Sequence, residues 1–265
     1  MAALFFDIDG TLIDSYNGVR TVSDAVRAEL ERVQAQGHRL FIASGRPPLM
    51  LTPEIRCVRF DGAVLINGGL VELDGEPIHE ERMGADLVRD LHAYLDELGY
   101  EHMFVTAHHI YMPRSNEWLL RFFAEGDQQD IFSFDYDLED VLARTIKIEC
   151  GVDVPERPRV TQLLKQHTQG RVNCDGHGGT GTFEVYPTVM SKAKGIAVAL
   201  ERLGLTRAQA YAFGDGTNDL EMIAYCGTGV AMANGEDVVK RAADLVCPPV
   251  GEDGLASALR MLFPA

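Results

Sequence analysis

The segment Asp7-Ile8-Asp9-Gly10-Thr11-Leu12 follows directly on an apolar run that begins at Leu4. A short, continuously apolar run is typical of a strand that is buried on both faces of a parallel sheet, so we expect a strand over 4–8. Two carboxylates one residue apart, followed by a glycine-threonine turn, then stand at the end of that strand. They supply a nucleophile, a proton-transfer group and most of a metal site within three positions.

Three later segments also place polar residues where a predicted strand meets a loop or a helix. Ser44-Gly45-Arg46 follows the apolar run 40–43, and Gly214-Asp215-Gly216-Thr217-Asn218-Asp219 follows the run 210–213. Lys192 stands just before a predicted helix. In open α/β sheets, ligands bind outside the carboxyl ends of the strands. Four placements that satisfy this rule indicate one shared site at one edge of a sheet.

The first part of the chain alternates predicted strands and helices. Val22, Val26, Leu30 and Val33 recur at helical spacing, and Gly37 is placed to end that helix. We expect further strands over 40–43 and 63–66. The alternation predicts an α/β fold with a Rossmann-like, doubly wound parallel sheet and right-handed crossovers.

The middle of the chain has a different pattern, and the α/β alternation returns after it. The pattern over 71–77 predicts a hairpin, and a mixture of amphipathic helices and strands then runs to Pro187, which suggests an inserted α+β domain with one sheet face covered by helices. The later helices and strands are expected over 193–203, 210–213, 220–225 and 229–232, followed by two more helices. The predicted organisation is a first core part over 1–82, an inserted domain over 83–187 and a second core part over 188–265.

Composition excludes several classes of protein. The net charge is -16, from 40 acidic against 24 basic residues, and no run of Lys or Arg is present, so nucleic acid is not an expected partner. The apolar start lacks the basic lead of a secretory signal, and nothing approaches the length of a membrane span. A cytoplasmic location, with no membrane partner, is the default expectation.

Cysteine and histidine usage favours neither disulfides nor a zinc site. The five cysteines are far apart, odd in number and never in a C-x-x-C pair, so we expect buried, inert thiols. The eight histidines show no spacing typical of metal ligands, and the adjacent His108 and His109 are expected to point apart.

Phosphoryl transfer with a divalent metal is the chemistry that needs this set of residues. A carboxylate nucleophile, here Asp7, can take the phosphoryl group as an acyl phosphate. The charge of the transition state requires cations and hydrogen-bond donors, which Mg²⁺, Lys192, Ser44 and backbone N–H groups of the turn after Asp9 would supply. Mg²⁺ prefers oxygen ligands, which suits Asp7, Asp215 and a backbone carbonyl. Asp9 would protonate the leaving alcohol and later take a proton from the attacking water.

The order of DIDGT, SGR, a lone lysine before a helix and GDGTND resembles the haloacid dehalogenase (HAD) superfamily, and in particular its Cof-type phosphatases with a class IIB cap. The segments Gly229–Gly235 and Glu252–Gly254 are similar to that branch as well. The resemblance implies a HAD-like core with an α+β cap that closes over the site and reads the leaving group.

The resemblance also assigns roles to individual residues. It implies that Asp7 is the nucleophile and Asp9 the general acid and base. The implied metal ligands are the side chains of Asp7 and Asp215 and the backbone carbonyl of Asp9, with Asp219 in the outer shell of the metal site. The residues implied to bind phosphate are Ser44, Gly45, Lys192 and Asn218.

Two assignments stay open at this point. Many relatives place glycine directly after their lysine, and Gly195 follows Lys194, but the length from Lys192 to Gly204 and the Ser191-Lys192 pair favour Lys192. For Arg46, a structural role and a phosphate-binding role are equally well supported.

The expected function is a Mg²⁺-dependent phosphatase that hydrolyses small phosphorylated metabolites, such as sugar phosphates, through a phospho-aspartate intermediate. The alternatives are a phosphosugar mutase, or a specialised phosphatase of sucrose, trehalose or mannosylglycerate phosphates. A non-catalytic binding protein is disfavoured because no motif residue is degraded. The expected partner is a phosphorylated small molecule, and the expected assembly a monomer or homodimer.

Overall fold

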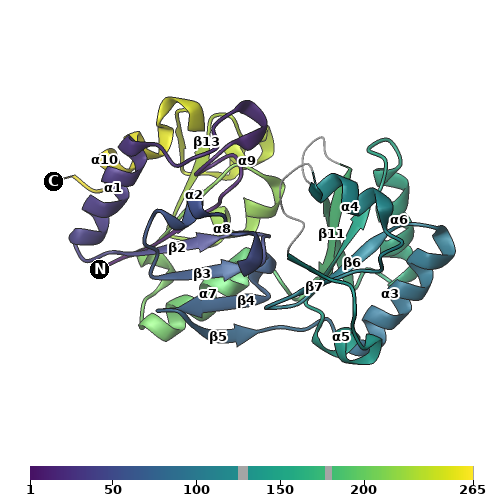
Figure 1. Ribbon diagram of the computed structural model, residues 1–265. Helices are drawn as coiled ribbons and strands as arrows, with labels where there is room; N and C mark the ends of the chain where they lie inside the picture. Colours follow the sequence, from purple (N-terminus) through teal and green to yellow (C-terminus); the bar gives the residue numbers. More distant parts are fainter. Residues whose placement is uncertain (125–130, 177–180, 265) are drawn as a thin grey trace. The chain divides into compact units, whose positions relative to one another are not determined.

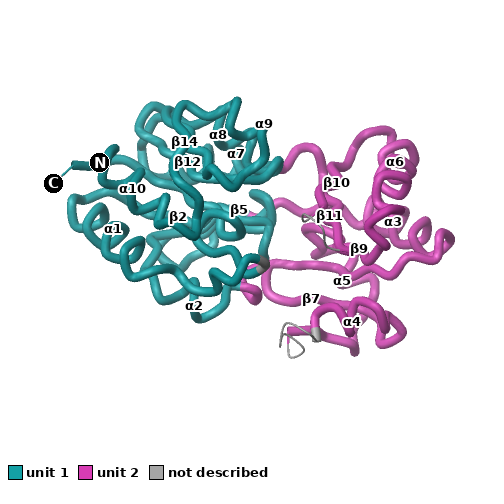
Figure 2. Tube along the Cα trace, turned by 90° about the horizontal axis from the view of Figure 1, so that it is seen from above, with its two compact units in different colours: residues 1–46, 51–79, 191–265 teal, residues 47–50, 80–190 magenta. Residues whose placement is uncertain are grey.

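The computed structural model describes residues 1–124, 131–176 and 181–264 of the chain. The chain divides into two compact units, which Figure 2 draws in teal and magenta. Unit 1 comprises Met1–Arg46, Leu51–His79 and Ser191–Ala265, and unit 2 comprises Pro47–Met50 and Glu80–Met190. Unit 1 is therefore assembled from both ends of the chain, and unit 2 almost entirely from its middle.

An eight-stranded sheet forms the centre of unit 1 (Figure 1). Its order is β14 (Leu245–Cys247), β13 (Thr228–Met232), β12 (Ala210–Gly214), β1 (Ala3–Phe6), β2 (Arg39–Ala43), β3 (Gly62–Leu65), β4 (Leu70–Leu73) and β5 (Glu76–Glu80). The strands from β14 to β3 are parallel to their neighbours, and β4 runs antiparallel to β3. The chain starts in the middle of this sheet and winds outward in both directions, so the predicted doubly wound α/β fold is confirmed.

Helices and short 3-10 turns complete unit 1. The helices are α1 (Asp24–Ala35), α2 (Pro53–Arg56), α7 (Lys192–Leu203), α8 (Leu220–Tyr225), α9 (Asp237–Ala242) and α10 (Gly254–Leu262). The 3-10 turns are η1 (Ser15–Asn17), η3 (Ile66–Gly68), η5 (Arg207–Gln209), η6 (Thr217–Asp219) and η7 (Val250–Glu252).

Both faces of the central strands are covered, which explains their unbroken apolar runs. Phe5 stacks on Phe41 with ring centroids 4.9 Å apart, and both belong to a buried cluster with residues of α7 and α8. Phe6 points the other way and stacks on Phe213 with centroids 4.8 Å apart. The helices α1 and α10, which pack against each other, are absent from the first cluster and contact β2 and β14 respectively. The central strands are therefore packed on both faces, which positions their carboxyl ends.

Unit 2 contains a six-stranded sheet of a different kind. Its order is β10 (Val172–Gly176), β11 (Thr182–Pro187), β9 (Lys147–Gly151), β6 (His102–Val105), β7 (Ile110–Tyr111) and β8 (Phe132–Ser133). The pairs are antiparallel except for β7 with β8, which is parallel. The remaining elements of the unit are η2 (Pro48–Met50), α3 (Ala85–Leu98), α4 (Glu117–Ala124), α5 (Leu138–Arg144) and α6 (Arg157–His167).

One face of the unit 2 sheet packs against α3, α5 and α6. Leu91 of α3, Val141 of α5 and Leu164 of α6 share a buried cluster with Phe104 and Ile148 of the sheet. The alternating pattern of β9 follows from this arrangement, because every second side chain faces the helices. The predicted α+β insert has the expected helix-covered face.

Two local features differ from the sequence predictions. The first strand ends at Phe6 rather than at Ile8, because the carbonyl oxygen of Ile8 accepts hydrogen bonds from the N–H groups of Leu12 at 2.9 Å and Ile13 at 3.0 Å, which turns the chain. Strand β14 was not predicted, since only helices were expected after residue 232. It is three residues long, and only Cys247 of them is buried, so it carries too little apolar pattern to be recognised.

The thiols differ in part from expectation. Cys150, Cys226 and Cys247 are buried and free, as predicted, and Cys174 is half-buried. Burial raises the pKa of Cys150 well above its ordinary value, so this thiol is held in the unreactive protonated form. The prediction is wrong for Cys57, which is exposed because α2 is a single short turn with little to cover its end.

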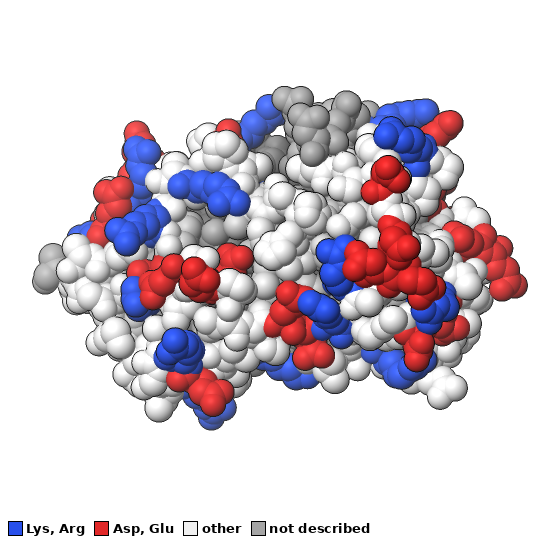
Figure 3. All heavy atoms as spheres, turned by 60° about the horizontal axis from the view of Figure 1, so that its bottom comes forward, with Lys and Arg blue, Asp and Glu red and all other residues white. Residues whose placement is uncertain are grey.

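The surface of the described residues carries charges of both signs. On the face shown in Figure 3, Lys and Arg side chains are interspersed with Asp and Glu side chains. This face therefore presents no continuous basic stripe of the kind that tracks a nucleic-acid backbone. Among the residues that the structure describes, no helix is both long enough and apolar enough to cross a membrane.

Candidate active site

The carboxyl edge of the parallel strands in unit 1 brings together the polar segments that the sequence singled out. Asp7, Ser44 and Asp215 directly follow β1, β2 and β12, and these three strands are neighbours in the sheet. The N–H group of Asp7 donates to the carbonyl oxygen of Phe213 at 2.9 Å, which fixes the end of β1 against β12. Residues about 200 positions apart in sequence thereby share one site.

Gly10 allows the loop after β1 to approach Asp215 closely. It has a φ of +88°, and a Cβ atom there would lie 2.1 Å from Oδ2 of Asp215. The neighbouring Thr11 donates its hydroxyl to Oδ1 of Asp215 at 3.2 Å. Any side chain at position 10 would therefore displace the Asp215 carboxylate. This steric limit explains why the DIDGT segment has glycine at this position.

Lys192 is the lysine that reaches this site. It is the first residue of α7, and Ser191 caps the helix by accepting from the N–H group of Lys194 at 3.4 Å. Nζ of Lys192 donates to Oδ1 of Asp7 and to Oδ1 of Asp219, both at 2.6 Å. Lys194 instead lines a shallow hollow with residues of α8. The structure thus places Lys192, not its rival, beside Asp7.

Asp219 holds the loop after β12 in place. Its Oδ2 accepts from the N–H groups of Asp215 at 2.9 Å and Gly216 at 3.0 Å, while Oδ1 accepts from Lys192. A Cβ atom on Gly214 would lie 2.6 Å from Cγ of Asp219, so a glycine is needed there for the carboxylate to fit. Asp219 is fully buried and already has three donors, which suits an organising role.

The cluster has more negative than positive charge. Asp7, Asp215 and Asp219 each offer a carboxylate oxygen, and these oxygens lie within 4.8 Å of one another. Burial, helped by repulsion from Asp219, raises the pKa of Asp7 to about 7 although Lys192 opposes this. Burial and then repulsion from Asp7 and Asp219 raise the pKa of Asp215 to about 8. Burial alone would lower the pKa of Lys192, but Asp219 and Asp7 raise it, so the lysine stays charged.

The donor set fits a hard divalent cation. Grouped carboxylate oxygens are the ligands that Mg²⁺ prefers, and here three carboxylates surround a single lysine. A bound cation would favour the ionised form of Asp7 and Asp215 and would lower their pKa values. Of the four predicted metal-site residues, three lie in this cluster, and the side chain of Asp9 does not.

Asp9 turns toward Arg46 instead. Nε of Arg46 donates to Oδ2 of Asp9 at 2.8 Å, and Nη2 donates to Oδ1 at 2.5 Å, which makes a bidentate pair. The Asp9 side chain is 47% exposed and the Arg46 side chain 21% exposed. Because the Asp9 side chain lies outside the cluster, only its backbone carbonyl could bind a metal there. Its carboxylate is accessible to solvent and to a leaving group.

The predicted phosphate-binding residues lie in segments that end at the same edge of the sheet as the cluster. Ser44 is buried, and its Oγ accepts from the N–H group of Arg46 at 3.2 Å, so Gly45 lies in a tight loop between them. Asn218 is half-buried in the 3-10 turn η6 that follows Asp215. Ser44, Gly45, Lys192 and Asn218 therefore all lie at the carboxyl edge of the unit 1 sheet.

Asn234 is a residue of this edge to which sequence reasoning gave no role. Its Nδ2 donates to the carbonyl oxygen of Gly10 at 2.8 Å, and its Oδ1 accepts from the N–H group of Val250 at 2.9 Å. It ties the loop after β13 to the turn after β1. A lone asparagine in a loop gives no sequence signal for such a contact, because its partners lie 224 and 16 positions away.

Two histidines that the sequence did not connect also come together, in unit 2. His92, Asp96 and His102 each offer a ligand atom, and these atoms lie within 4.8 Å of one another. The spacing of the histidines along the sequence did not predict this grouping. The available signal was the four-residue spacing of His92 and Asp96, which places both on one face of a helix.

Comparison with known proteins gives a consistent answer. Residues 4–259 match the model of the haloacid dehalogenase-like hydrolases. The chain is 31% identical over 271 residues to a Bacillus subtilis (strain 168) protein named "Putative phosphatase YkrA", covering 98% of this chain and 96% of that protein. It is 26% identical over 255 residues to the 5-amino-6-(5-phospho-D-ribitylamino)uracil phosphatase YcsE of the same organism, covering 96% of this chain and 92% of YcsE.

Solved structures agree with these relatives. The HAD subclass IIB sugar phosphatase BT4131 matches with a TM-score of 0.85 and 25% identity, covering 99% of each chain. A haloacid dehalogenase-like hydrolase from Bacteroides thetaiotaomicron matches with a TM-score of 0.83 and 30% identity, also over 99% of each chain. The fold and site thus define a phosphatase class of enzyme. The chain belongs to the haloacid dehalogenase-like hydrolases, within the Cof-type group.

Proposed function

We propose that the protein is a Mg²⁺-dependent phosphatase that hydrolyses small phosphomonoesters, sugar phosphates among them, through a phospho-aspartate intermediate on Asp7. The observation that carries the proposal is the cluster of Asp7, Asp215 and Asp219, of which Asp7 and Asp219 are buried against Lys192. The similarity to a sugar phosphatase and to a 5-amino-6-(5-phospho-D-ribitylamino)uracil phosphatase supports the substrate class.

The first step is attack by Asp7 on phosphorus. A carboxylate oxygen of Asp7 forms the new P–O bond while the bond from phosphorus to the substrate's ester oxygen breaks. Lys192 holds Oδ1 of Asp7 and supplies a fixed positive charge next to the reacting group. Ser44, Gly45 and Asn218 are the proposed partners of the phosphoryl oxygens.

Magnesium, when bound, would add positive charge beside the phosphoryl oxygens and favour the ionised form of the nucleophile. The proposed ligands are the side chains of Asp7 and Asp215 and the backbone carbonyl of Asp9. Asp219 stands behind them, where its contacts with Lys192 and with the N–H groups of Asp215 and Gly216 hold Asp215 in position.

Asp9 moves the protons of both steps. Its carboxyl group gives a proton to the leaving alcohol, and the resulting carboxylate then takes a proton from the water that attacks phosphorus. The second attack breaks the bond between phosphorus and Asp7, which releases phosphate and restores the carboxylate. The bidentate pair with Arg46 orients the Asp9 carboxylate for both transfers.

A phosphate-release assay tests the proposal. Purified protein with Mg²⁺ is expected to release phosphate from members of a broad panel of phosphomonoesters, and chelation of the metal is expected to stop the release. Folded protein that released no phosphate from any member would contradict the proposal. Return of the phosphoryl group to a sugar phosphate, with activation by a sugar bisphosphate, would instead identify the mutase alternative.

A further inference from the structure

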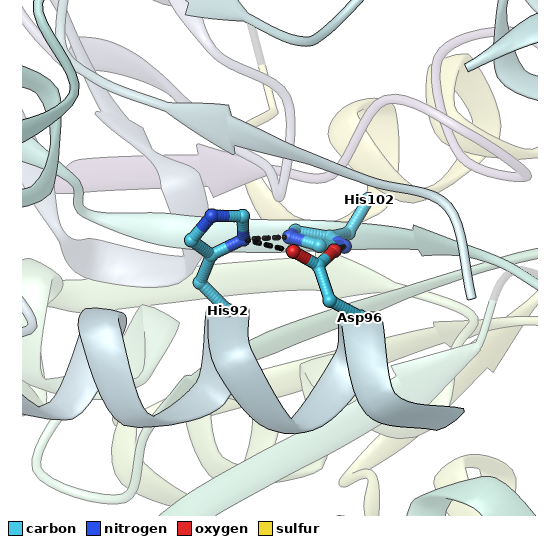
Figure 4. Close-up of side chains that lie close together, drawn as sticks. All are labelled: His92, Asp96 and His102. Atoms are coloured by element: carbon cyan, nitrogen blue, oxygen red, sulfur yellow. Dashed lines mark hydrogen bonds and ion pairs between the residues drawn. The ribbon is translucent and has the colours of Figure 1, made fainter. Parts of the chain in front are cut away.

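The cluster of His92, Asp96 and His102 lies within unit 2, where α3 leads into β6 (Figure 4). His92 and Asp96 are one turn apart on α3, so their side chains share one face of the helix. The helix ends at Gly99, whose φ of +75° allows the chain to reverse, and His102 then begins β6. The turn brings the imidazole of His102 back against the helix.

The three side chains point at a common place. Nδ1 of His92 and Nε2 of His102 are 2.7 Å apart, and Nδ1 of His92 lies 3.6 Å from Oδ2 of Asp96. Figure 4 shows both rings and the carboxylate converging from the helix and the strand. The two ring nitrogens are thus within hydrogen-bond distance of each other, with a carboxylate beside them.

The tautomer of His102 is set by its second nitrogen. Nδ1 lies 3.0 Å from the carbonyl oxygen of Tyr100, which can only accept, so Nδ1 carries the hydrogen and Nε2 presents its lone pair toward His92. A hydrogen bond from the remote ring nitrogen to a backbone carbonyl is the arrangement that orients histidine ligands of metals.

Burial also keeps His102 neutral and fixed. The residue is only 3% exposed, and its ring packs edge-on against Phe104 with centroids 5.6 Å apart. Burial lowers the pKa of His102, although the hydrogen bond to the carbonyl of Tyr100 and the charge of Asp96 act in the opposite direction. A neutral imidazole is the form that binds a metal, and the orientation of this ring is already fixed. His102 therefore needs little rearrangement to become a ligand.

We propose that His92 Nδ1, His102 Nε2 and a carboxylate oxygen of Asp96 form a binding site for a zinc-like divalent transition ion. Tetrahedral zinc with ligands at about 2.0–2.1 Å separates neighbouring ligand atoms by about 3.4 Å, so the two nitrogens need to move apart by about 0.7 Å. The hydrogen on Nδ1 of His92 leaves to solvent, and Nε2 of that ring takes one from solvent, so His92 stays neutral. The Asp96 side chain is 61% exposed, which leaves the fourth position to water.

The ligand chemistry separates this site from the carboxylate cluster of unit 1. Imidazole nitrogens suit zinc, cobalt, nickel and copper, whereas sites of oxygen alone suit magnesium. The ion would join α3 to β6 across the Gly99 turn and would therefore stabilise unit 2. This inference does not depend on the proposed function, because none of its residues takes part in the proposed reaction.

Cobalt titration of the full chain tests the site, with Cys57→Ser in every variant to remove the exposed thiol. Co²⁺ in a tetrahedral site with nitrogen ligands absorbs visible light far more strongly than Co²⁺ among oxygens and waters. We expect strong absorption that saturates at one ion per chain, is abolished by added Zn²⁺ and persists with excess Mg²⁺. No strong absorption in the folded protein would overturn the proposal.

Variants assign the signal to its ligands. His92→Gln is expected to remove the strong absorption, and Asp96→Asn, at an exposed position that tolerates substitution, is expected to weaken Co²⁺ binding at least about tenfold. The matched control His108→Gln, an exposed histidine of the same unit, is expected to bind Co²⁺ like the parent. If the Asp96 and His92 variants bound Co²⁺ with the same absorption and affinity as the parent, the proposal would be overturned. The two histidines would then form only a hydrogen bond between the helix and the strand.

Discussion

The two ionisable clusters of this molecule differ in composition and in how well they could be predicted from the sequence. The unit 1 cluster joins Asp7, Asp215, Asp219 and Lys192 from segments up to 212 positions apart, and every member is an oxygen donor or a fixed cation. The unit 2 cluster joins His92, Asp96 and His102 within a single helix-turn-strand. A site built from distant segments can be predicted from sequence when its residues follow neighbouring parallel strands, because those strands end at the same edge. A site built across a short turn can be missed, because the path of the turn decides which side chains meet.

The clusters also handle their charge differently. Burial and mutual repulsion raise the pKa values of Asp7 and Asp215 to about 7 and about 8, so the unit 1 cluster needs a cation to be fully ionised. In unit 2, burial lowers the pKa of His102, and a neutral ring needs no counter-charge. One cluster is therefore expected to take a hard, strongly charged ion and the other a borderline ion bound through neutral nitrogen.

Asp7→Asn is expected to give the largest effect. Removing the nucleophilic oxygen should lower turnover by about 10⁴-fold or more, because the amide cannot form the acyl phosphate. Phosphate release measures the turnover, and circular dichroism checks that the variant is folded. Asp14→Asn, a matched change in the same loop, should keep turnover near the parent value, and equal losses in the two variants would contradict the role of Asp7.

Metal exchange should separate the two clusters next. Removing Mg²⁺ with a chelator should lower turnover by about 10³-fold, since such an ion contributes several kcal/mol of transition-state stabilisation. Mg²⁺ added back should restore turnover, and in a separate sample excess Mg²⁺ should not displace Co²⁺ from unit 2 of the cobalt-loaded protein. Full activity in chelator would contradict metal-dependent catalysis, provided that elemental analysis verifies that the protein contains no Mg²⁺.

Lys192→Ala is expected to affect both activity and stability. Loss of the charge beside Asp7 should lower turnover by about 10² to 10³-fold. Because buried carboxylates would lose their partner, unfolding should require about 3 kcal/mol less free energy, seen as a lower midpoint in denaturant. Lys194→Ala removes a lysine two positions later in the same helix and should leave both measurements close to the parent.

The pH dependence of stability should reveal the raised pKa values. Asp7 and Asp215 titrate near 3.8 in the unfolded chain but near 7 and 8 in the folded chain without metal, so the folded state binds more protons between these values. Stability of the metal-free protein should therefore fall as pH rises from about 5 to 8, by at most about 1.4 kcal/mol per group and pH unit. Mg²⁺ should flatten this slope in thermal melts, and an unchanged slope would count against metal binding at these carboxylates.

Arg46→Lys should give the smallest effect. Lysine keeps the charge but cannot reproduce the bidentate contact, so we expect about a tenfold loss of turnover. The effect is small because the pair is partly exposed to water. Arg56 donates to the backbone carbonyl of Leu51, away from Asp9, so Arg56→Lys serves as the control. Equal turnover in the Arg46 and Arg56 variants would contradict a positioning role for Arg46.

The sequence predicted the core fold because its signals are local and strong. The runs at 40–43 and 210–213 are apolar on both faces, and the helix 220–225 has the predicted bounds. Strand β14 escaped because three residues with one buried side chain carry no periodicity. The edge of the parallel sheet then brings Asp7, Ser44 and Asp215 together without any need to know the loops.

Contacts that depend on loop paths were beyond the sequence. The pair of Asp9 with Arg46 joins residues 37 positions apart, and either side chain had several equally good partners in the sequence. The His102 contact depends on the reversal at Gly99, whose direction follows from its left-handed conformation and not from the pattern of nearby residues. Such geometry is set by packing, which the linear pattern does not record.

The most direct test of the central claim is to trap the phosphoryl group on Asp7. Asp9→Asn should slow hydrolysis of the intermediate more than its formation when the substrate is an aryl phosphate, whose leaving group needs little protonation. Intact-mass and peptide mass spectrometry with Mg²⁺ should then find one phosphoryl group per chain, on Asp7. Phosphate release by the parent enzyme without any labelled Asp7 in this variant, or with the label on another residue, would contradict the account.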